Sequence, residues 1–376
     1  MNVIVWGENH HNALGLVRSL GEVGHNVYLL LYKVRLNYVA KSRYVKKCVY
    51  LDKDSDVISI IKTISQNLED KPALLVTGDP IASFVDSHLN EINQYAITEG
   101  GFQTNDINKY RDKHVSNALA AEIGFNVPKS WVLQNGDSYD VDFIFPIILK
   151  EACSLPGSKK VLAVINSMTE LKDHLAELED SCYPLIVQQF INKDYEIMLQ
   201  GCSLNHGETI VSKVANRRIR VYPEIYGGAS YSSSVNIDED DELVEIRDMV
   251  LDFMRRVGYS GLFSAEFLYK DGKYYFQEVN FRNDGTSYLS TSCGVNLPDI
   301  YCHSLKRQEI KEGTYKKSIY INVFSDYHHV SFHKLLFKDW IKDVITANCY
   351  SHFNWKDPIP YLYYLPGALK YYSNTK

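Results

Sequence analysis

The stretch Gly261-Leu-Phe-Ser-Ala-Glu-Phe-Leu-Tyr-Lys-Asp-Gly-Lys-Tyr-Tyr-Phe-Gln-Glu-Val-Asn280 decides the fold of this chain. Two runs with β-strand alternation flank Asp271-Gly272, a dipeptide that is typical of a tight hairpin turn. We therefore expect an antiparallel hairpin here. Its few polar side chains are the first candidates for a functional site.

The turn decides which side chains of the hairpin share a face. Residues two apart on a strand point the same way, so Glu278 and Asn280 are expected together. A strict two-residue turn pairs Glu266 with Gln277 and sends Glu278 to the opposite face from Glu266. A three-residue loop over residues 270–272 shifts the pairing and brings Glu266, Glu278 and Asn280 onto one face. The Asp-Gly dipeptide is compatible with both turns, so both registers stay open.

Two carboxylates and an amide oxygen on an otherwise apolar hairpin favour a site for a hard cation. Neighbouring carboxylates repel each other unless a cation lies between them, and oxygen-only ligands suit Mg²⁺ that bridges nucleotide phosphates. Mn²⁺ is the alternative ion. The predicted metal ligands are Glu266, Glu278 and Asn280. The competing interpretation is that both glutamates are ordinary charges on a solvent-exposed strand.

Composition and charge narrow the classes of protein that fit. The 376 residues exceed the usual size of one hydrophobic core, so two or three subdomains are expected. The net charge of −6 gives no electrostatic footprint for nucleic acid or an anionic membrane. No apolar run reaches the roughly 18 residues of a membrane-spanning helix. The seven cysteines lack CxxC spacing, which favours a reduced, cytoplasmic protein over a disulfide framework or a zinc ribbon.

The segments that precede the hairpin predict two kinds of sheet. Residues 1–105 alternate apolar strands with helices, which is typical of a small doubly wound parallel sheet. Their first turn, residues 7–12, lacks the GxGxxG glycines of a dinucleotide site. From about residue 128, short strands separated by turns favour an α+β unit. The last segment contains a helix-like stretch over residues 330–345 and has no assigned role.

The hairpin and its surroundings resemble a known family. Phe276-Gln-Glu-Val-Asn-Phe-Arg282 resembles the glutamate-x-asparagine-x-arginine signature that closes the nucleotide site of ATP-grasp enzymes. From about residue 108 to 300, further motifs agree with that family in order and spacing. The resemblance implies a doubly wound pre-ATP-grasp domain followed by a two-lobed ATP-grasp domain with antiparallel sheets. The implied boundaries are 1–105, 106–310 (lid lobe about 128–190, large lobe about 191–310) and a C-terminal extension over 311–376.

The resemblance also implies a set of nucleotide-binding residues. Two lysines that contact phosphates correspond to Lys113, in the entry segment, and Lys150, at the end of a strand. A loop over residues 154–160 closes over the phosphates, the backbone of residues 187–191 reads the adenine edge, and Glu196 takes the ribose hydroxyls. The ATP-binding residues predicted in this way are Lys113, Lys150, Ser154, Gly157, Ser158, Lys159, Gln188, Gln189, Phe190, Ile191 and Glu196.

One dense basic segment, residues 213–223, is the candidate site of the second substrate. On a regular strand Arg218, Arg220 and Tyr222 share a face, and arginine matches carboxylate or phosphate oxygens in a fork. The competing interpretation is a solvated basic strand edge that discourages aggregation. The segment resembles the arginine-tyrosine-proline stretch of the D-aspartate ligase-like and carboxylate-amine ligase branch, beside a carbamoyl-phosphate-synthase-like alternative. Arg218, Arg220 and Arg282 are the predicted catalytic residues.

Together these features predict an ATP-dependent carboxylate-amine ligase. Such an enzyme activates a carboxylate as an acyl phosphate and couples it to an amine, using ATP and Mg²⁺. The expected partners are a small carboxylate and an amine, with no nucleic acid, no membrane, and a homodimer as the candidate assembly. Two alternatives stay open, namely a phosphotransferase built on the same domain and a non-catalytic ATP-binding regulatory protein.

Overall fold

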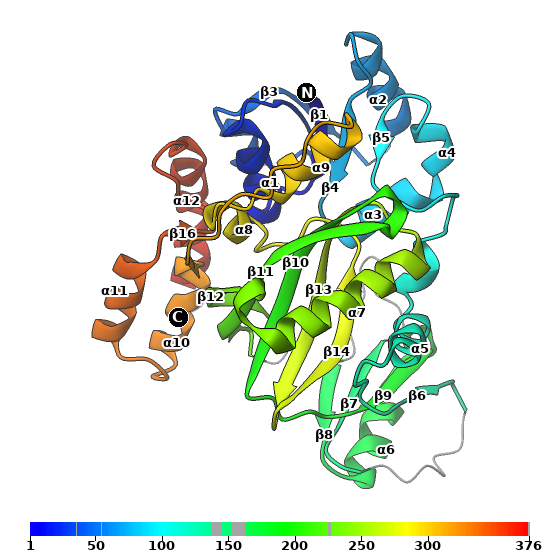
Figure 1. The fold of residues 1–376 in the computed structure, drawn as a ribbon. Helices are drawn as coiled ribbons and strands as arrows, with labels where there is room; N and C mark the ends of the chain where they lie inside the picture. The colour runs from blue at the N-terminus through cyan, green and yellow to red at the C-terminus, as the bar shows by residue number, and fades with distance from the viewer. Residues whose placement is uncertain (35, 54, 137–143, 152–161, 225–226, 375–376) are drawn as a thin grey trace.

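Three β-sheets follow one another along the chain in the computed structural model (Figure 1). The structure describes residues 1–376 apart from 35, 54, 137–143, 152–161, 225–226 and 375–376. The N-terminal sheet is parallel, and the other two sheets are antiparallel. The exception is one parallel pair of strands near the C-terminus, in the largest sheet. The predicted fold class, a parallel N-terminal unit followed by antiparallel sheets, is confirmed.

The N-terminal sheet has the order β3-β2-β1-β4-β5. Its inner strands are almost wholly buried because helices cover both faces, as expected for a parallel sheet. The sequence did not predict β3, because its Val-Lys-Lys-Cys-Val-Tyr-Leu run lies half exposed at an edge. The elements are β1 (Asn2–Gly7), α1 (His11–Gly21), β2 (Asn26–Tyr32), β3 (Val45–Leu51), α2 (Val57–Gln66), β4 (Ala73–Val76), α3 (Asp79–Ser87), α4 (Leu89–Ile92) and β5 (Ile97–Thr98).

The smallest sheet has four antiparallel strands in the order β6-β9-β7-β8 and lies at one end of the molecule (Figure 1). Its apolar face packs on α6 through Leu171 and Leu175. The elements are β6 (Ser130–Leu133), β7 (Ile147–Glu151), β8 (Leu162–Ile165), α6 (Met168–Ala176) and β9 (Leu185–Gln189), and α5 (Lys113–Ile123) precedes them.

The large sheet has seven strands in the order β14-β13-β10-β11-β12-β15-β16. The long helix α7 (Asp241–Val257) packs across one face and buries an apolar stripe that includes Leu243, Val250 and Phe253. In chain order, the first five strands of this sheet are β10 (Tyr195–Leu204), β11 (Thr209–Tyr222), β12 (Gly228–Asn236), β13 (Gly261–Lys270) and β14 (Lys273–Asn280).

The C-terminal residues continue the large sheet. Strands β15 (Ile319–Ile321) and β16 (Cys349–Tyr350) extend it beyond β12. The single helix predicted over 330–345 is wrong, because α10 ends at Ser331 and α11 starts at Phe337. Between them His333 has a φ of 57°, which no continuing helix tolerates. The helices of this half are α8 (Tyr288–Ser292), α9 (Leu297–Leu305), α10 (Val323–Ser331), α11 (Phe337–Thr346) and α12 (Ile359–Asn374).

One hydrophobic cluster joins the N-terminal sheet to the large sheet. It contains Val3 and Leu14 from the first unit, Val214 from β11, and Ile300 from α9. The shared core fixes the N-terminal unit over one end of the large sheet. In the part of the chain that the structure describes, none of the helices combines the length and the apolar character that crossing a bilayer requires.

Candidate active site

The large sheet has one polar and one apolar face. Strands β10, β11 and β13 pair so that Glu196 lies opposite Arg218, and Met198 lies opposite Glu266. The alternate residues, such as Ile197 and Leu199, point the other way and pack with the α7 side of the core. The polar face therefore collects the side chains of Glu196, Gln200, Asn216, Arg218, Ser264, Glu266, Glu278 and Asn280.

The hairpin turn has two residues. Asp271 and Gly272 have φ angles of 49° and 76°, the double positive φ of the tight hairpin turn that matches strand twist. The pairing continues regularly from Lys270 opposite Lys273 to Phe267 opposite Phe276. Of the two turns that the sequence left open, the structure therefore has the two-residue turn.

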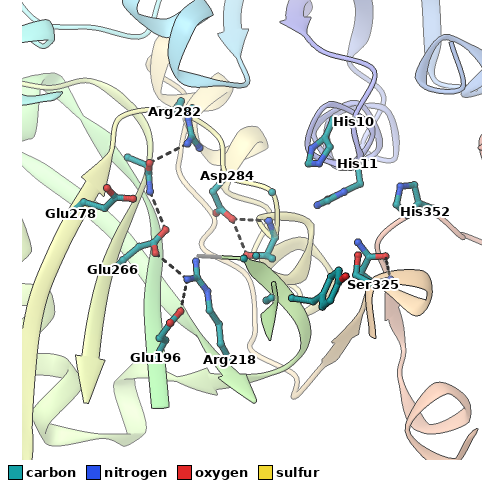
Figure 2. A pocket seen from close by; sticks show the side chains of 18 of the residues that line it. His10, His11, Glu196, Arg218, Glu266, Glu278, Arg282, Asp284, Ser325 and His352 are labelled. Carbon is teal, nitrogen blue, oxygen red and sulfur yellow. Dashed lines mark hydrogen bonds and ion pairs between the residues drawn. The ribbon is translucent and has the colours of Figure 1, made fainter. Parts of the chain in front are cut away.

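A β-bulge at Gln277 then changes the register, which neither predicted turn included. Beyond the bulge Glu266 lies directly opposite Glu278. Phe276 is buried in the core with Phe267, and without the extra residue Glu278, two positions further on, would point into the same core. The bulge places Glu278 beside Glu266, and Figure 2 shows both carboxylates together.

Glu266, Glu278 and Asn280 form a compact acidic cluster. Asn280 Nδ2 donates to Glu266 Oε1 at 3.1 Å, and Lys113 Nζ lies 3.7 Å from Glu278 Oε2. Burial raises the pKa of Glu266, and the Glu278 charge adds to this against the opposing effect of Arg218. Burial also disfavours the Glu278 carboxylate, but Lys113 outweighs it with help from Lys150, so the pKa of Glu278 is lowered.

Arg218 joins this cluster to Glu196. Its Nη1 lies 2.6 Å from Glu196 Oε2 and 3.1 Å from Glu266 Oε2 (Figure 2). Lys193 also donates to Glu196, so that carboxylate is held by two cations. Arg218 Nε is buried without a hydrogen-bond partner among the described residues. Arg218 is therefore at the site that the sequence predicted, but its charge is largely balanced by two glutamates.

Lys150 enters from the small sheet. It lies on β7, and its Nζ donates to Gln188 Oε1 on the neighbouring β9 at 2.7 Å. Burial, helped by the nearby positive charge of Lys113, lowers the pKa of Lys150 to about 7, against the attraction of Glu278. A half-buried ammonium whose charge is poorly compensated is suited to an anionic ligand such as a phosphate.

The affinity for Mg-ATP is expected to fall as the pH rises from 7.5 to 9. Because the pKa of Lys150 is about 7 in the free protein, its amine is mostly neutral in this range, and phosphates that need the ammonium must bind together with a proton. The expected loss is up to about tenfold per pH unit. Titration calorimetry checks it, and Lys150→Met should flatten the dependence. A wild-type affinity independent of pH in this range contradicts the expectation.

Not every predicted nucleotide-binding residue can be placed. The loop residues Ser154, Gly157, Ser158 and Lys159 lie outside the described residues. Residues 187–191 do lie where the chain leaves the small sheet for the large one, as a hinge between lobes requires. There the side chain of Gln188 accepts a hydrogen bond from Lys150. The backbone amides of Gln189 and Phe190 donate to the carbonyls of Lys129 and Pro146, respectively. Ile191 is buried.

Arg282 forms a fork with a carboxylate of the N-terminal unit. Its Nε and Nη2 donate to the two oxygens of Asp79 at 2.8 Å each, and Nη2 also donates to Asn280 Oδ1 at 3.1 Å. Asp79 is the first residue of α3, and Arg111 lies 3.3 Å from it as well. Arg282 thereby orients a predicted metal ligand and ties the hairpin to the first sheet. Its predicted role as a phosphate clamp stays a prediction.

Arg220 points elsewhere. Irregular pairing between β11 and β12 around residues 218–221 interrupts the alternation that would keep Arg218, Arg220 and Tyr222 on one face. The Arg220 guanidinium donates to both oxygens of buried Asp326 at 2.8 and 2.9 Å and also contacts Asp343. It does not line the cavity described below, so we no longer assign it a catalytic role.

An open cavity of about 730 Å³ lies beside the acidic cluster. One side of it is lined by six of the predicted residues, namely Glu196, Arg218, Glu266, Glu278, Asn280 and Arg282. Other lining residues could not be predicted from the sequence, because they come from separate segments of the chain. They include His10, His11, Tyr38, Asp284, Thr286, Asn322, Ser325, His352 and Tyr364. The turn that contains His10 and His11, residues 7–12, stands out in the sequence only because it lacks the glycines of a dinucleotide site.

The acidic cluster fits a magnesium ion in its donor chemistry. Glu266, Glu278 and Asn280 offer oxygen atoms only, which hard cations prefer. Half-buried Glu266 lies opposite the second carboxylate, Glu278, and a cation between them would offset their repulsion. Within the described ranges there is no group of three or more His, Cys, Asp or Glu side chains arranged for a metal. Two carboxylates and one amide would therefore have to share the ion with phosphate oxygens.

Comparison with known proteins agrees with this geometry. Residues 118–294 match the model of the ATP-grasp domain family. The chain therefore contains an ATP-grasp domain, and the resemblance seen in the sequence is confirmed.

Individual relatives are distant. A carbamoyl phosphate synthase large chain from Gemmatimonas aurantiaca is 22% identical over 231 residues, which cover 58% of this chain and 20% of that protein. The chain thus spans about a fifth of that relative's length. Among solved structures, an N5-carboxyaminoimidazole synthetase from Staphylococcus aureus has a TM-score of 0.67 at 14% identity, covering 90% of this chain and 86% of that chain. An L-amino acid ligase from Bacillus licheniformis has a TM-score of 0.63 at 14% identity, covering 85% and 79%. These likenesses establish the fold.

Proposed function

We propose that this chain is an ATP-dependent ligase that activates a substrate carboxylate as an acyl phosphate and couples it to an amine. The observation that carries the proposal is the meeting of four groups from four elements, of which Glu266 and Glu278 line the cavity. Lys113 of α5 and Lys150 of β7 approach Glu278 of β14, which lies opposite Glu266 of β13. Two cations and two carboxylates in one place suit a metal-bound nucleotide triphosphate.

Each group of residues in the site has its own role in the proposed reaction. Lys113 and Lys150 hold the phosphates, and phosphate charge restores the proton that burial tends to remove from Lys150. Glu266, Glu278 and Asn280 would hold Mg²⁺, which would neutralise charge on the transferring phosphoryl group. Arg218 keeps Glu196 and Glu266 in fixed orientations. Glu196, held by two cations, stays the candidate for the ribose hydroxyls.

The reaction needs no protein nucleophile. A substrate carboxylate oxygen attacks the γ-phosphorus of ATP, and the bond from that phosphorus to the bridging oxygen breaks, so that ADP leaves. The amine nitrogen then attacks the acyl carbon, the bond from that carbon to the phosphate oxygen breaks, and phosphate leaves as the nitrogen loses a proton. The described cysteines are all free, and four of the six are buried, so they are poorly placed for covalent catalysis.

The relatives support the class of reaction and not a substrate. The solved structures similar to this chain include an amino acid ligase and a carboxyaminoimidazole synthetase, and a curated relative is a carbamoyl phosphate synthase. We transfer from these names only the formation of a new bond by a ligase or synthase, and the use of ATP rests on the match to the ATP-grasp domain family. We also propose that the chain belongs to the D-aspartate ligase-like branch, which its basic segment, residues 213–223, resembles.

The test is release of ADP and phosphate from Mg-ATP by the purified chain, with a panel of carboxylates and amines supplied singly and in pairs. We expect turnover only when one carboxylate and one amine are both present, with one ADP and one phosphate for each bond formed. ADP without free phosphate indicates a phosphotransferase instead. Binding of Mg-ATP without turnover of any pair would count for a non-catalytic protein.

A further inference from the structure

The cavity has one charged and one uncharged side. Its six charged lining residues all belong to the large sheet or to the segment after β14, namely Glu196, Arg218, Glu266, Glu278, Arg282 and Asp284. The other side is built by His10 and His11 at the start of α1, by Tyr38, and by the C-terminal residues Asn322, Ser325, His352 and Tyr364. We call these seven residues the neutral wall. Figure 2 shows His10, His11, His352 and Ser325 together on the side of the cavity opposite Glu196, Glu266 and Glu278.

Ring stacking and a buried ion pair hold the neutral wall in place. His352 stacks on Tyr364 with ring centroids 3.7 Å apart, and Tyr38 lies 5.5 Å from His352 and 5.3 Å from Tyr364. Arg18, fully buried, donates from Nη2 to the carbonyl of His352 at 2.9 Å. A wall whose rings are already fixed loses little conformational entropy when a ligand binds.

Several polar atoms of the neutral wall lack a protein partner. Among the described residues, the hydroxyls of Tyr38, Tyr364 and Ser325 and the ring of His11 make no hydrogen bond. Tyr38 and His352 are each 6% exposed, yet both line the cavity. Because these residues line the cavity, their polar atoms are free to hydrogen-bond a ligand there.

The histidines of the wall are uncharged at neutral pH. Burial lowers the pKa of His11 and His352 well below the ordinary value, and burial together with Arg282 lowers the pKa of His10 to about 4. A neutral imidazole has one nitrogen that donates and one that accepts. The wall therefore presents both donors and acceptors and no net charge.

Three classes of ligand group fit this wall poorly. An ammonium group finds no carboxylate on the wall, and a carboxylate or phosphate finds only neutral imidazoles. A purely aliphatic group leaves the wall's donors and acceptors without hydrogen bonds, which disfavours its binding. Uncharged groups that donate and accept, which are hydroxyls and amides, satisfy the wall.

We propose that the neutral wall binds an uncharged, hydroxyl- or amide-bearing part of one substrate, and that Tyr38, His352 and Tyr364 determine this specificity. The inference rests on the proposed ligase function, because it assumes that a substrate occupies the cavity beside the acidic cluster. A site built to hydrogen-bond a hydroxyl rejects an analogue without it far more strongly than an apolar pocket rejects an extra methylene.

The test is a binding measurement that does not require turnover. The full chain, with Mg²⁺ and a non-hydrolysable ATP analogue, is titrated calorimetrically with matched amino acids: serine against alanine, threonine against valine, tyrosine against phenylalanine, and glutamine against glutamate and lysine. We expect the uncharged polar member of at least one set to bind about tenfold more tightly or better. Tyr38→Phe and Tyr364→Phe should bring that ratio close to one, and Tyr363→Phe, the exposed neighbour on α12, should leave it unchanged.

The outcomes separate this inference from the proposed function. Tighter binding of the apolar or charged member, a ratio that Tyr38→Phe and Tyr364→Phe do not change, or no amino acid binding to a chain that still binds the ATP analogue overturns the inference alone. Failure to bind the analogue with Mg²⁺ overturns the proposed function. Each variant's affinity for the analogue, expected at the wild-type value, shows that the fold is intact.

Discussion

Glu278→Gln is expected to lower kcat by about 10²–10³-fold, the loss typical of removing one group that stabilises transition-state charge. The substitution keeps the shape of the side chain and removes the charge that faces Lys113 at 3.7 Å. In the proposed site the same charge would balance a bound metal ion. Because the Glu278 charge raises the pKa of Glu266, its loss should also make Glu266 easier to ionise. The measurement is steady-state turnover at several Mg²⁺ concentrations, with an increased Mg²⁺ requirement expected.

The matched control is Glu242→Gln, an exposed glutamate in the first turn of α7, on the helix that covers the apolar face of the same sheet. It should leave kcat and the Mg²⁺ requirement within twofold of wild type. If Glu278→Gln retains wild-type turnover at every Mg²⁺ concentration while folded, the acidic cluster is not the metal site.

Asp357→Asn is expected to destabilise the folded chain by about 3–5 kcal/mol, because it leaves a buried arginine without its counter-ion. Arg18 and Asp357 are fully buried, with Arg18 Nε 3.1 Å from Asp357 Oδ2. Ser42 Oγ and the Arg43 amide also donate to Asp357, at 2.8 and 2.9 Å. The pair fastens the C-terminal segment to the N-terminal unit. Urea denaturation of both forms measures the difference.

Two further variants show whether the buried charge is the cause. Asp339→Asn, on the exposed side of α11, should change stability by less than about 0.5 kcal/mol. Arg18→Met combined with Asp357→Leu removes both charges and should recover much of the loss, because replacing a buried pair with apolar groups is often neutral. If Asp357→Asn is as stable as Asp339→Asn, the ion pair does not hold the two parts together.

The sequence predicted the hairpin well but not its register. Alternation and the Asp-Gly turn identify both strands, because these signals are local. The bulge at Gln277 has no comparable signal, since glutamine is acceptable on either face of a strand. The bulge is needed because Phe276 packs in the core while Glu278, two residues later, faces the cavity. These two environments exist only in the folded sheet, so the sequence alone does not indicate the bulge.

The nucleotide side was predictable because the family's motifs follow one another along the chain. Lys150 and Gln188 came from separate motifs, and the antiparallel pairing of β7 with β9 makes them neighbours. Arg220 shows the limit of the same reasoning. Strict alternation assigns it to the Arg218 face, but irregular pairing and the buried Asp326 take it elsewhere.

The neutral wall could not have been predicted from local patterns. His11 and His352 are more than 300 positions apart, and their rings lie 5.4 Å from each other only because the C-terminal segment returns to α1. That return depends on Arg18 and Asp357, which are inconspicuous as single residues in the sequence. Long-range polar contacts of this kind leave no periodic signal.

The most direct test of the ligase proposal follows an oxygen atom. A substrate carboxylate labelled with ¹⁸O is incubated with the chain, Mg-ATP and the amine partner, and the released phosphate is analysed by mass spectrometry. Activation as an acyl phosphate predicts that one ¹⁸O moves from the carboxylate into each phosphate, because the amine attacks the acyl carbon and expels that oxygen with phosphorus. Phosphate that carries no ¹⁸O, while the product bond forms, would contradict the central claim.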